Sequence, residues 1–293
     1  MSETTPAADV KTRFLIFSDT HGLDSPPDFV SRQYADVAIH CGDLTTESQI
    51  EEYKASIRFL RAVNSPLKLV IAGNHDFTMD IPIFQRKAAE AQPLDPHLIQ
   101  KFYGNYGEVR ELFGEEKETG ITFLDEGIHS FRLQNGALLN AYASPYTPSC
   151  GYWGFQYHRD IGHDFRIGNV DIVMTHGLPK GIMDRTHSGQ GAGRQHLFQA
   201  IARAQYRPLM HCFGHIHEGW GWQACPSVLI SALSMIKHKG DPMDCFLKSH
   251  CSEDPHPLKR GSETLFINAA MEGSQDILIQ PPWVVDIELP AAV

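Results

Sequence analysis

The stretch Phe14-Leu15-Ile16-Phe17-Ser18-Asp19-Thr20-His21-Gly22 determines how we expect this chain to fold. Its four consecutive apolar residues stop at turn residues, which predicts a short strand buried on both faces. Asp19 and His21 then lie at the C-terminal end of that strand, the edge of an open α/β sheet where ligands bind. A carboxylate and an imidazole two residues apart can turn toward one cation. One such pair arises easily by chance, so it indicates a metal site only if similar residues follow other strands of the chain.

Two further strands, predicted at residues 36–41 and 67–72, end in loops of the same kind. The first is followed by Gly42-Asp43 and the second by Gly73-Asn74-His75-Asp76. Between them, residues 47–63 place apolar side chains at helical spacing, which predicts an amphipathic helix that crosses over the sheet. Strands and helices that alternate in this way are typical of a parallel sheet. We therefore expect these loops to meet at one edge.

The rest of the chain predicts a second sheet. Residues 81–120 are helical and polar, and residues 121–143 alternate around Asn135-Gly136, a dipeptide that favours a tight hairpin and so begins a more antiparallel sheet. Later strands are predicted at 170–175, 209–213, 264–269 and 283–289, and helices at 28–34 and 195–204. Two of the strands end in His176-Gly177 and Gly214-His215-Ile216-His217. The predicted fold class is α/β, with two mixed β-sheets packed face to face and flanked by α-helices.

Composition argues against several classes of function. The 293 residues include 35 acidic and 25 basic side chains, a formal charge of −10, so we expect no broad basic surface for long nucleic acids. Small substrates remain open, because bound dications can dominate the local field. No apolar run approaches the roughly 20 residues that span a membrane. Residues 1–12 are too polar for a secretory signal, and we expect a cytoplasmic protein.

No linker or repeat divides the chain. We predict a flexible tail at residues 1–12 and one domain over 13–293, with a polar insertion at about 237–263. The six cysteines form no Cys-x-x-Cys pair, and their scatter favours a reduced, intracellular protein. The insertion holds four potential zinc ligands, Cys245, His250, Cys251 and His256. Their spacing fits no standard finger, so a solvated insertion is favoured.

Five motif blocks, taken in order, resemble the calcineurin-like metallophosphoesterase superfamily. They are Asp19-Thr20-His21, Gly42-Asp43, Gly73-Asn74-His75-Asp76, His176 and Gly214-His215-Ile216-His217. Their flanks, with Ser144-Pro145-Tyr146, resemble more narrowly its metallophosphoesterase-domain-containing branch. Any one residue could be structural: Asp43, for instance, could cap the next helix. Random loops, however, rarely place only metal-competent side chains at successive strand ends.

The resemblance implies a dimetal centre at the C-terminal ends of the strands. It assigns one ion to Asp19, His21 and His217 and the other to Asn74, His176 and His215, with Asp43 bridging both. Oxygen and imidazole ligands without thiolates suit two divalent ions of Mn, Fe or Zn. Such a pair can bind phosphoryl oxygens and turn a bridging water into a hydroxide for in-line attack.

The resemblance also makes His75 a phosphate contact and the general acid for the leaving alkoxide, with Asp76 as its orienting partner. An inert His75 beside the metals is the alternative. Asn74 is a further candidate for substrate contact. In the aromatic loop 144–159, the side chains that could stack on a nucleobase or another flat leaving group are Tyr146, Trp153 and Phe155. Simple packing of a long loop is the competing interpretation.

We therefore expect a metal-dependent phosphoester hydrolase, more narrowly a phosphodiesterase of small or nucleotide-like molecules, with a small-molecule phosphoester as its partner. Two other classes stay open. One is a dimetal enzyme that acts on a non-phosphate substrate, since a metal pair also polarises carbonyls. The other is a scaffold that holds metal or a nucleotide without turnover.

Overall fold

Six strands form the first sheet. They are β1 (Val10–Phe17), β2 (Val37–His40), β3 (Leu67–Val70), β4 (Ile121–Phe123), β12 (Phe246–Ser249) and β14 (Trp283–Leu289). The computed structural model describes residues 9–91, 93–149, 151–226, 246–255, 257–272 and 280–292. The strand order is β12-β14-β1-β2-β3-β4. Neighbours run parallel except β1 and β14, which are antiparallel, so the sheet is mixed.

Six more strands form the second sheet. They are β5 (Gly127–Arg132), β6 (Leu138–Ser144), β9 (Ile172–Thr175), β10 (Met210–Phe213), β11 (Gly221–Pro226) and β13 (Glu263–Asn268). Their order is β11-β13-β10-β9-β6-β5, with parallel pairs in the centre and an antiparallel pair at each edge. A separate short pair joins β7 (Thr147–Pro148) to β8 (Gln156–Tyr157). The second sheet is therefore mixed as well.

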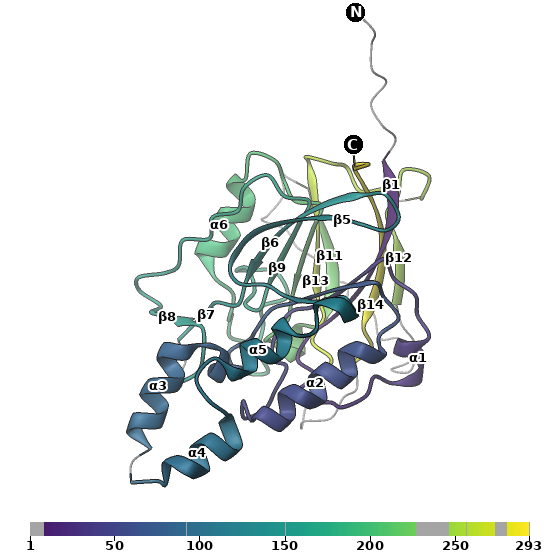
Figure 1. Ribbon diagram of the computed structural model, residues 1–293. Helices are drawn as coiled ribbons and strands as arrows, with labels where there is room; N and C mark the ends of the chain where they lie inside the picture. The colour runs from purple at the N-terminus through teal and green to yellow at the C-terminus, as the bar shows by residue number, and fades with distance from the viewer. Residues whose placement is uncertain are drawn as a thin grey trace, which may run out of the picture.

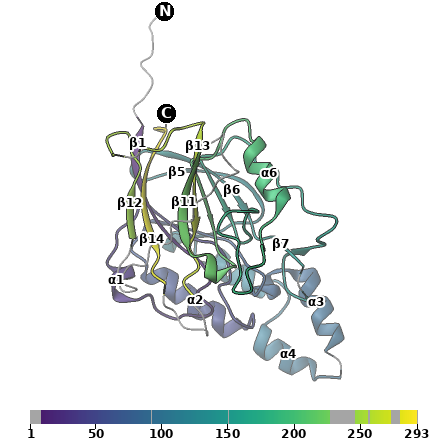
Figure 2. The ribbon, with the colours of Figure 1, turned by 180° about the vertical axis from the view of Figure 1, so that it is seen from behind.

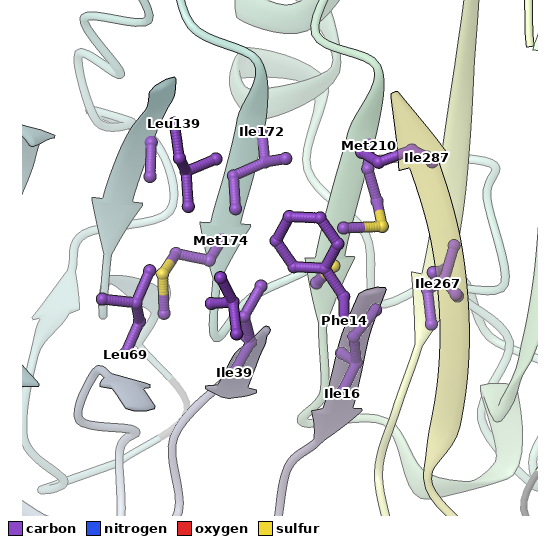
Figure 3. Close-up of a cluster of buried hydrophobic side chains, with 14 of the residues drawn as sticks. Phe14, Ile16, Ile39, Leu69, Leu139, Ile172, Met174, Met210, Ile267 and Ile287 are labelled. Carbon is purple, nitrogen blue, oxygen red and sulfur yellow. The ribbon is translucent and has the colours of Figure 1, made fainter. Parts of the chain in front are cut away.

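The two sheets pack face to face through apolar side chains. Figure 3 shows Phe14, Ile16, Ile39 and Leu69 of the first sheet meeting Leu139, Ile172, Met174 and Met210 of the second. Because side chains alternate along a strand, β1 sends Phe14 and Ile16 into this layer and Leu15 and Phe17 to its outer face. The shared core supports our proposal that residues 13–293 form one domain.

Helices cover the outer faces of both sheets. The first sheet packs on α2 (Ile50–Ala62) and α5 (Glu108–Gly114), and the second packs on α6 (Gln195–Arg203). In Figures 1 and 2, α3 (Ile81–Glu90) and α4 (Pro96–Tyr103) project from the body near β7 and β8. The remaining helical pieces are α1 (Asp28–Ser31) and the 3₁₀ turns η1 (Phe77–Met79), η2 (Lys117–Thr119) and η3 (His217–Gly219).

The start of α2 fixes the loop that follows β2. The Glu52 carboxylate accepts hydrogen bonds from the backbone N–H groups of Gln49 at 2.8 Å, Thr46 at 3.0 Å and Glu47 at 3.1 Å. With Gln49 this is a capping box, in which two residues at a helix start satisfy each other's backbone groups. The helix therefore anchors the chain three residues beyond Asp43.

The structure confirms the predicted fold class. The ends of the predicted βαβ elements agree to within three residues, except that β1 begins four residues before Phe14. The hairpin around Asn135-Gly136 is also present, as β5 and β6. One assignment is wrong: residues 121–123 form β4 and extend the first sheet instead of beginning the second. The reason is backbone pairing with β3, in which Lys68 N–H donates to the Gly120 carbonyl at 2.7 Å and Leu124 N–H to that of Val70 at 2.8 Å.

Two boundaries in the predicted domain organisation also differ. Residues 10–12 belong to β1, where they pair with 287–289, so they are not part of a flexible tail. Residues 246–249 form the edge strand β12, so the predicted polar insertion contributes to the first sheet. Of the four potential zinc ligands, Cys245 and His256 lie outside the described residues. Among the helices that are described, none combines the length and the apolar character needed to cross a bilayer.

Candidate metal centre

Five loops meet at one edge of the two sheets. They follow β1, β2 and β3 of the first sheet and β9 and β10 of the second. Six of their side chains form two groups, each with its ligand atoms within 4.8 Å of one another. The first group is Asp19, His21 and His217, and the second group is Asp43, His176 and His215. Asn74 joins the second group, since its Oδ1 lies 3.1 Å from His176 Nε2. All seven predicted ligands are thus brought together, and the structure places Asp43 with the second group.

Asp19 is the centre of the first group. His217 Nε2 lies 3.3 Å from Asp19 Oδ1, and the backbone N–H of His215 donates to both oxygens of this carboxylate at 3.0 and 3.1 Å. Burial raises the pKa of Asp19, but the hydrogen bond and charge of His217 outweigh burial and lower the pKa to about 2. The site therefore keeps a buried anion at neutral pH.

Asp43 and His176 form the core of the second group. His176 Nε2 lies 3.1 Å from Asp43 Oδ2, and His176 Nδ1 donates to the Cys41 carbonyl at 2.9 Å. Burial lowers the pKa of His176, but the charge of Asp43 outweighs burial and raises the pKa to about 9. Because the carbonyl holds Nδ1, Nε2 is the nitrogen left to bind a metal.

Glu272 belongs to this site and was missed in the sequence analysis. Its Oε2 lies 2.7 Å from His21 Nε2 and 3.9 Å from His217 Nδ1. Burial lowers the pKa of His21, but the contact with Glu272 and the charge of Asp43 outweigh it and raise the pKa to about 9. A signal was available, because Glu272 follows the predicted strand 264–269 by three residues. That strand is parallel to β10, so its C-terminal end lies at the same edge.

Four residues of the two groups have a strained backbone. The φ angle is +53° at Asp19, +43° at His21, +53° at Asp43 and +69° at His215. Side chains disfavour this left-handed region, at a cost of about 1–3 kcal/mol per residue. Such strain persists where the surrounding structure enforces it, and it concentrates at functional sites. The clustering of all four residues at one edge marks this edge as functional.

Two glycines leave room for the buried carboxylates. A Cβ at Gly73 would collide with the carboxylate of Asp43, and a Cβ at Gly214 would collide with that of Asp19. Neither glycine has a positive φ, so close approach is the reason for glycine at these positions. Glycine at these two strand ends therefore keeps the site uncrowded.

His75 stands beside the first group. Its ring centroid is 5.0 Å from that of His21, and its backbone N–H donates to Asp43 Oδ1 at 2.8 Å. His75 Nδ1 donates to the Thr46 carbonyl at 2.7 Å, so Nε2 is the nitrogen available to a substrate. The side chain is partly exposed. The His75 side chain is therefore accessible to solvent and close to the metal-ligand candidates.

Asp76 has a different role from the predicted one. It is fully buried and accepts hydrogen bonds from the backbone N–H groups of Leu44, Thr45 and Gly73 at 2.8–3.1 Å, and from the Thr45 hydroxyl at 2.8 Å. Burial and the charge of Asp43 raise its pKa to about 6. Asp76 thus joins the loop after β2 to the loop after β3. The prediction that it orients the His75 ring is wrong, because the Thr46 carbonyl does so.

Trp153 is the aromatic residue of the 144–159 loop that reaches His75. The two ring centroids are 4.2 Å apart. The next residue, Gly154, donates its backbone N–H to the Asn74 carbonyl at 2.9 Å, which attaches this loop to the ligand loop. Trp153 is therefore positioned to contact a substrate at His75.

The other two aromatic candidates are placed differently. Phe155 is 6% exposed and packs in the core beneath the first sheet, so the prediction that its ring stacks on a substrate is wrong. Tyr146 lies between Phe155 and His163, with ring centroids 6.0 and 4.4 Å away. For these two residues, loop packing is the better interpretation.

The donor set fits a pair of divalent cations. Imidazole nitrogens and carboxylate and amide oxygens suit such ions. Within the described residues, His21 Nε2 is buried and has no hydrogen bond of good geometry, although Glu272 is close. A cation held between this nitrogen and the neighbouring carboxylates would satisfy it. Two buried carboxylates also require compensating positive charge.

Comparison with known proteins gives a family match. The model of the calcineurin-like phosphoesterase family matches residues 12–219 of this chain, a segment that contains all five motif blocks. Glu272 lies beyond the matched segment.

Two relatives extend this comparison. The chain is 32% identical to the human Metallophosphoesterase domain-containing protein 1 over 222 residues, which cover 73% of this chain and 63% of that protein. It is 30% identical to Probable rhamnogalacturonate lyase C of Emericella nidulans over 225 residues, which cover 74% of this chain and 18% of that protein. The matched region thus spans less than two thirds of the length of these relatives.

Proposed function

Because this chain belongs to the calcineurin-like phosphoesterase family, we propose that it hydrolyses phosphoesters with two divalent metal ions of Mn, Fe or Zn. The observation that carries the proposal is the meeting of two ligand groups, each with a buried carboxylate, beside a histidine with one available ring nitrogen. When bound, the ions polarise a phosphoryl oxygen and acidify the attacking water. The residues that would hold the first ion are Asp19, His21 and His217, those that would hold the second are Asn74, His176 and His215, and Asp43 would serve both.

His75 is the proposed general acid. A water molecule forms a bond to phosphorus and gives up a proton to solvent, while the bond from phosphorus to the leaving oxygen breaks. The leaving oxygen takes a proton from His75 Nε2, which regains one from solvent. The Thr46 carbonyl supports this role, because it occupies Nδ1 and fixes the ring. Asn74, next in the chain, is a further candidate for contact with the phosphate.

The proposed substrates are small or nucleotide-like phosphodiesters. A flat ring beside His75 could stack on Trp153, and the formal charge of −10 does not favour long nucleic acids. We propose that the protein acts in the cytoplasm, in keeping with the free, buried thiols of Cys41, Cys212 and Cys251 in the part of the chain that the structure describes.

A direct assay tests the proposed function. We expect the Mn²⁺-loaded protein to hydrolyse bis-p-nitrophenyl phosphate, to lose this activity on chelation and to regain it when Mn²⁺ is restored. Inactivity toward a broad phosphoester panel despite two bound ions would contradict the proposal and favour a non-phosphate substrate. Tight nucleotide binding without any turnover would favour a scaffold.

Glu272 is expected to strengthen metal binding by the first group. Its carboxylate adds negative charge beside His21 and His217, and groups that support metal ligands contribute about 10–100-fold in affinity. We expect Glu272→Gln to weaken Mn²⁺ binding by about that factor, measured by competition with a chromophoric chelator.

The matched control for this variant is Glu126→Gln. Glu126 Oε1 lies 2.7 Å from His163 Nε2, a Glu–His contact of equal length outside both ligand groups. We expect its Mn²⁺ affinity to equal that of the parent. Equal Mn²⁺ affinities in Glu272→Gln and the parent would show that Glu272 does not strengthen metal binding.

A further inference from the structure

A cavity of about 430 Å³ is lined in part by Trp153, the residue whose ring centroid lies 4.2 Å from that of His75. It is lined by residues of α3, α4 and the aromatic loop. Figure 1 shows these two helices projecting near β7 and β8. Its walls include the aromatic side chains Phe77, Phe84, Tyr103, Tyr152 and Trp153. An aromatic cavity of this size suits a flat ring, because rings stack favourably on aromatic side chains.

The cavity adjoins the proposed catalytic site at Trp153, which lines the cavity and lies beside His75. The His75 ring lies between His21 of the first group, at 5.0 Å, and Trp153, at 4.2 Å. Glu47 also lines the cavity, and its neighbour Thr46 holds His75 Nδ1. His75 is therefore close to both a metal-ligand candidate and a wall of the cavity. A group that leaves phosphorus on the side of His75 would depart toward this cavity.

We propose that this cavity binds the leaving group of the substrate, and that the preferred leaving group is a flat aromatic or heteroaromatic ring system. The proposal rests on the proposed function. It assigns substrate recognition to Trp153 and the α3–α4 helices, not to Tyr146 and Phe155.

The charged groups of the cavity favour a ring with a polar edge. Lys87 Nζ lies 4.6 Å from the ring centroid of Phe77 and 5.3 Å from that of Trp153. This ammonium can donate hydrogen bonds to a ring nitrogen or carbonyl, and Glu47 can accept them. A heteroaromatic ring can use both, whereas a small aliphatic leaving group can use neither.

Two esters with leaving groups of nearly equal acidity test the proposal. Methyl 2-naphthyl phosphate and methyl phenyl phosphate differ in ring size, so chemistry alone gives them similar rates. We expect the metal-loaded parent to prefer the naphthyl ester at least about fivefold in kcat/KM, mainly through KM, because stacking is worth about 1–3 kcal/mol per base. The preference should fall to about one in Trp153→Ala and in Ala88→Trp, which fills the cavity from α3.

The control is Tyr206→Ala, which removes an exposed aromatic ring outside the cavity and should keep the preference. A parent without preference, or a preference that survives in both cavity variants while their melting temperatures match the parent, would overturn the proposal. If neither ester is hydrolysed, the proposed function fails. The cavity can then still be tested by comparing the affinities of 2-naphthyl phosphate and phenyl phosphate by calorimetry. Tighter binding of 2-naphthyl phosphate than of phenyl phosphate, lost in Ala88→Trp, would support the cavity proposal. Equal affinities for the two phosphates would overturn it.

Discussion

Asp43→Asn is expected to lower kcat/KM for bis-p-nitrophenyl phosphate by about 10³-fold or more and to reduce the metal content. Asp43 is a buried anion that contacts His176 through one oxygen and the His75 backbone through the other. An amide keeps the shape but removes the charge that would be shared between two cations, and losses of this kind cost about 10²–10³-fold even for a single stabilising group. The measurements are steady-state kinetics in saturating Mn²⁺ and elemental analysis of the dialysed protein.

Asp36→Asn is the matched control for this variant. Asp36 precedes β2, at the opposite end of the strand from Asp43, and its Oδ2 accepts a hydrogen bond from Arg13 N–H at 2.8 Å. We expect parental turnover and metal content in this variant. Full activity in Asp43→Asn, with both ions retained, would contradict the shared-ligand role.

His75→Ala is expected to have an effect that depends on the leaving group. General acid catalysis contributes about 10²–10⁴-fold, and it matters most when the leaving oxygen is basic. We expect a loss in that range for methyl phenyl phosphate and a much smaller loss for methyl p-nitrophenyl phosphate, whose leaving group departs without a proton. The measurement is kcat for both esters in the parent and in the variant.

The control for His75→Ala is His97→Ala, at an exposed histidine of α4. It should leave both rates unchanged. An equal loss for the two esters in His75→Ala would show that His75 binds the phosphate without protonating the leaving group. No loss for either ester would make it inert, as the alternative interpretation holds.

The positions of the seven ligands could be predicted because parallel strands bring their C-terminal ends to one edge. Once buried strands are recognised from short apolar runs, the residues that follow them are expected at the C-terminal edge of their sheet, and the resemblance to the family identified seven of these residues as ligands. The same rule applies to Glu272 after β13, but sequence analysis overlooked it because the residue lies beyond the five motif blocks. Its contact with His21 depends on Met271 N–H donating to the Ser18 carbonyl at 2.9 Å, a pairing that no local pattern encodes.

Other features depend on tertiary contacts. Asp76 follows His75 in the sequence, yet its carboxylate turns to the backbone of the preceding loop, because buried N–H groups there need an acceptor. Phe155 and Trp153 are two residues apart in one aromatic loop, and only packing decides that the first enters the core and the second faces His75. The amino-acid sequence of the loop does not indicate which of the two rings is buried.

The pairing of edge strands could not be predicted from the sequence either. Residues 121–123 continue directly into a predicted hairpin, but they pair with the edge of β3 and so belong to the first sheet. Residues 246–249 lie in a polar stretch and still pair with β14. Edge strands are short and weakly patterned, so backbone hydrogen bonds to a neighbouring strand, and not hydrophobic periodicity, determine their place.

The most direct test of the metal centre is anomalous diffraction from crystals of the Mn²⁺-loaded protein, collected at the manganese absorption edge. We expect two peaks per chain, one contacted by Asp19, His21 and His217, the other by Asn74, His176 and His215, with Asp43 between them. A single peak, or peaks away from these side chains in a protein that hydrolyses phosphoesters, would contradict the account.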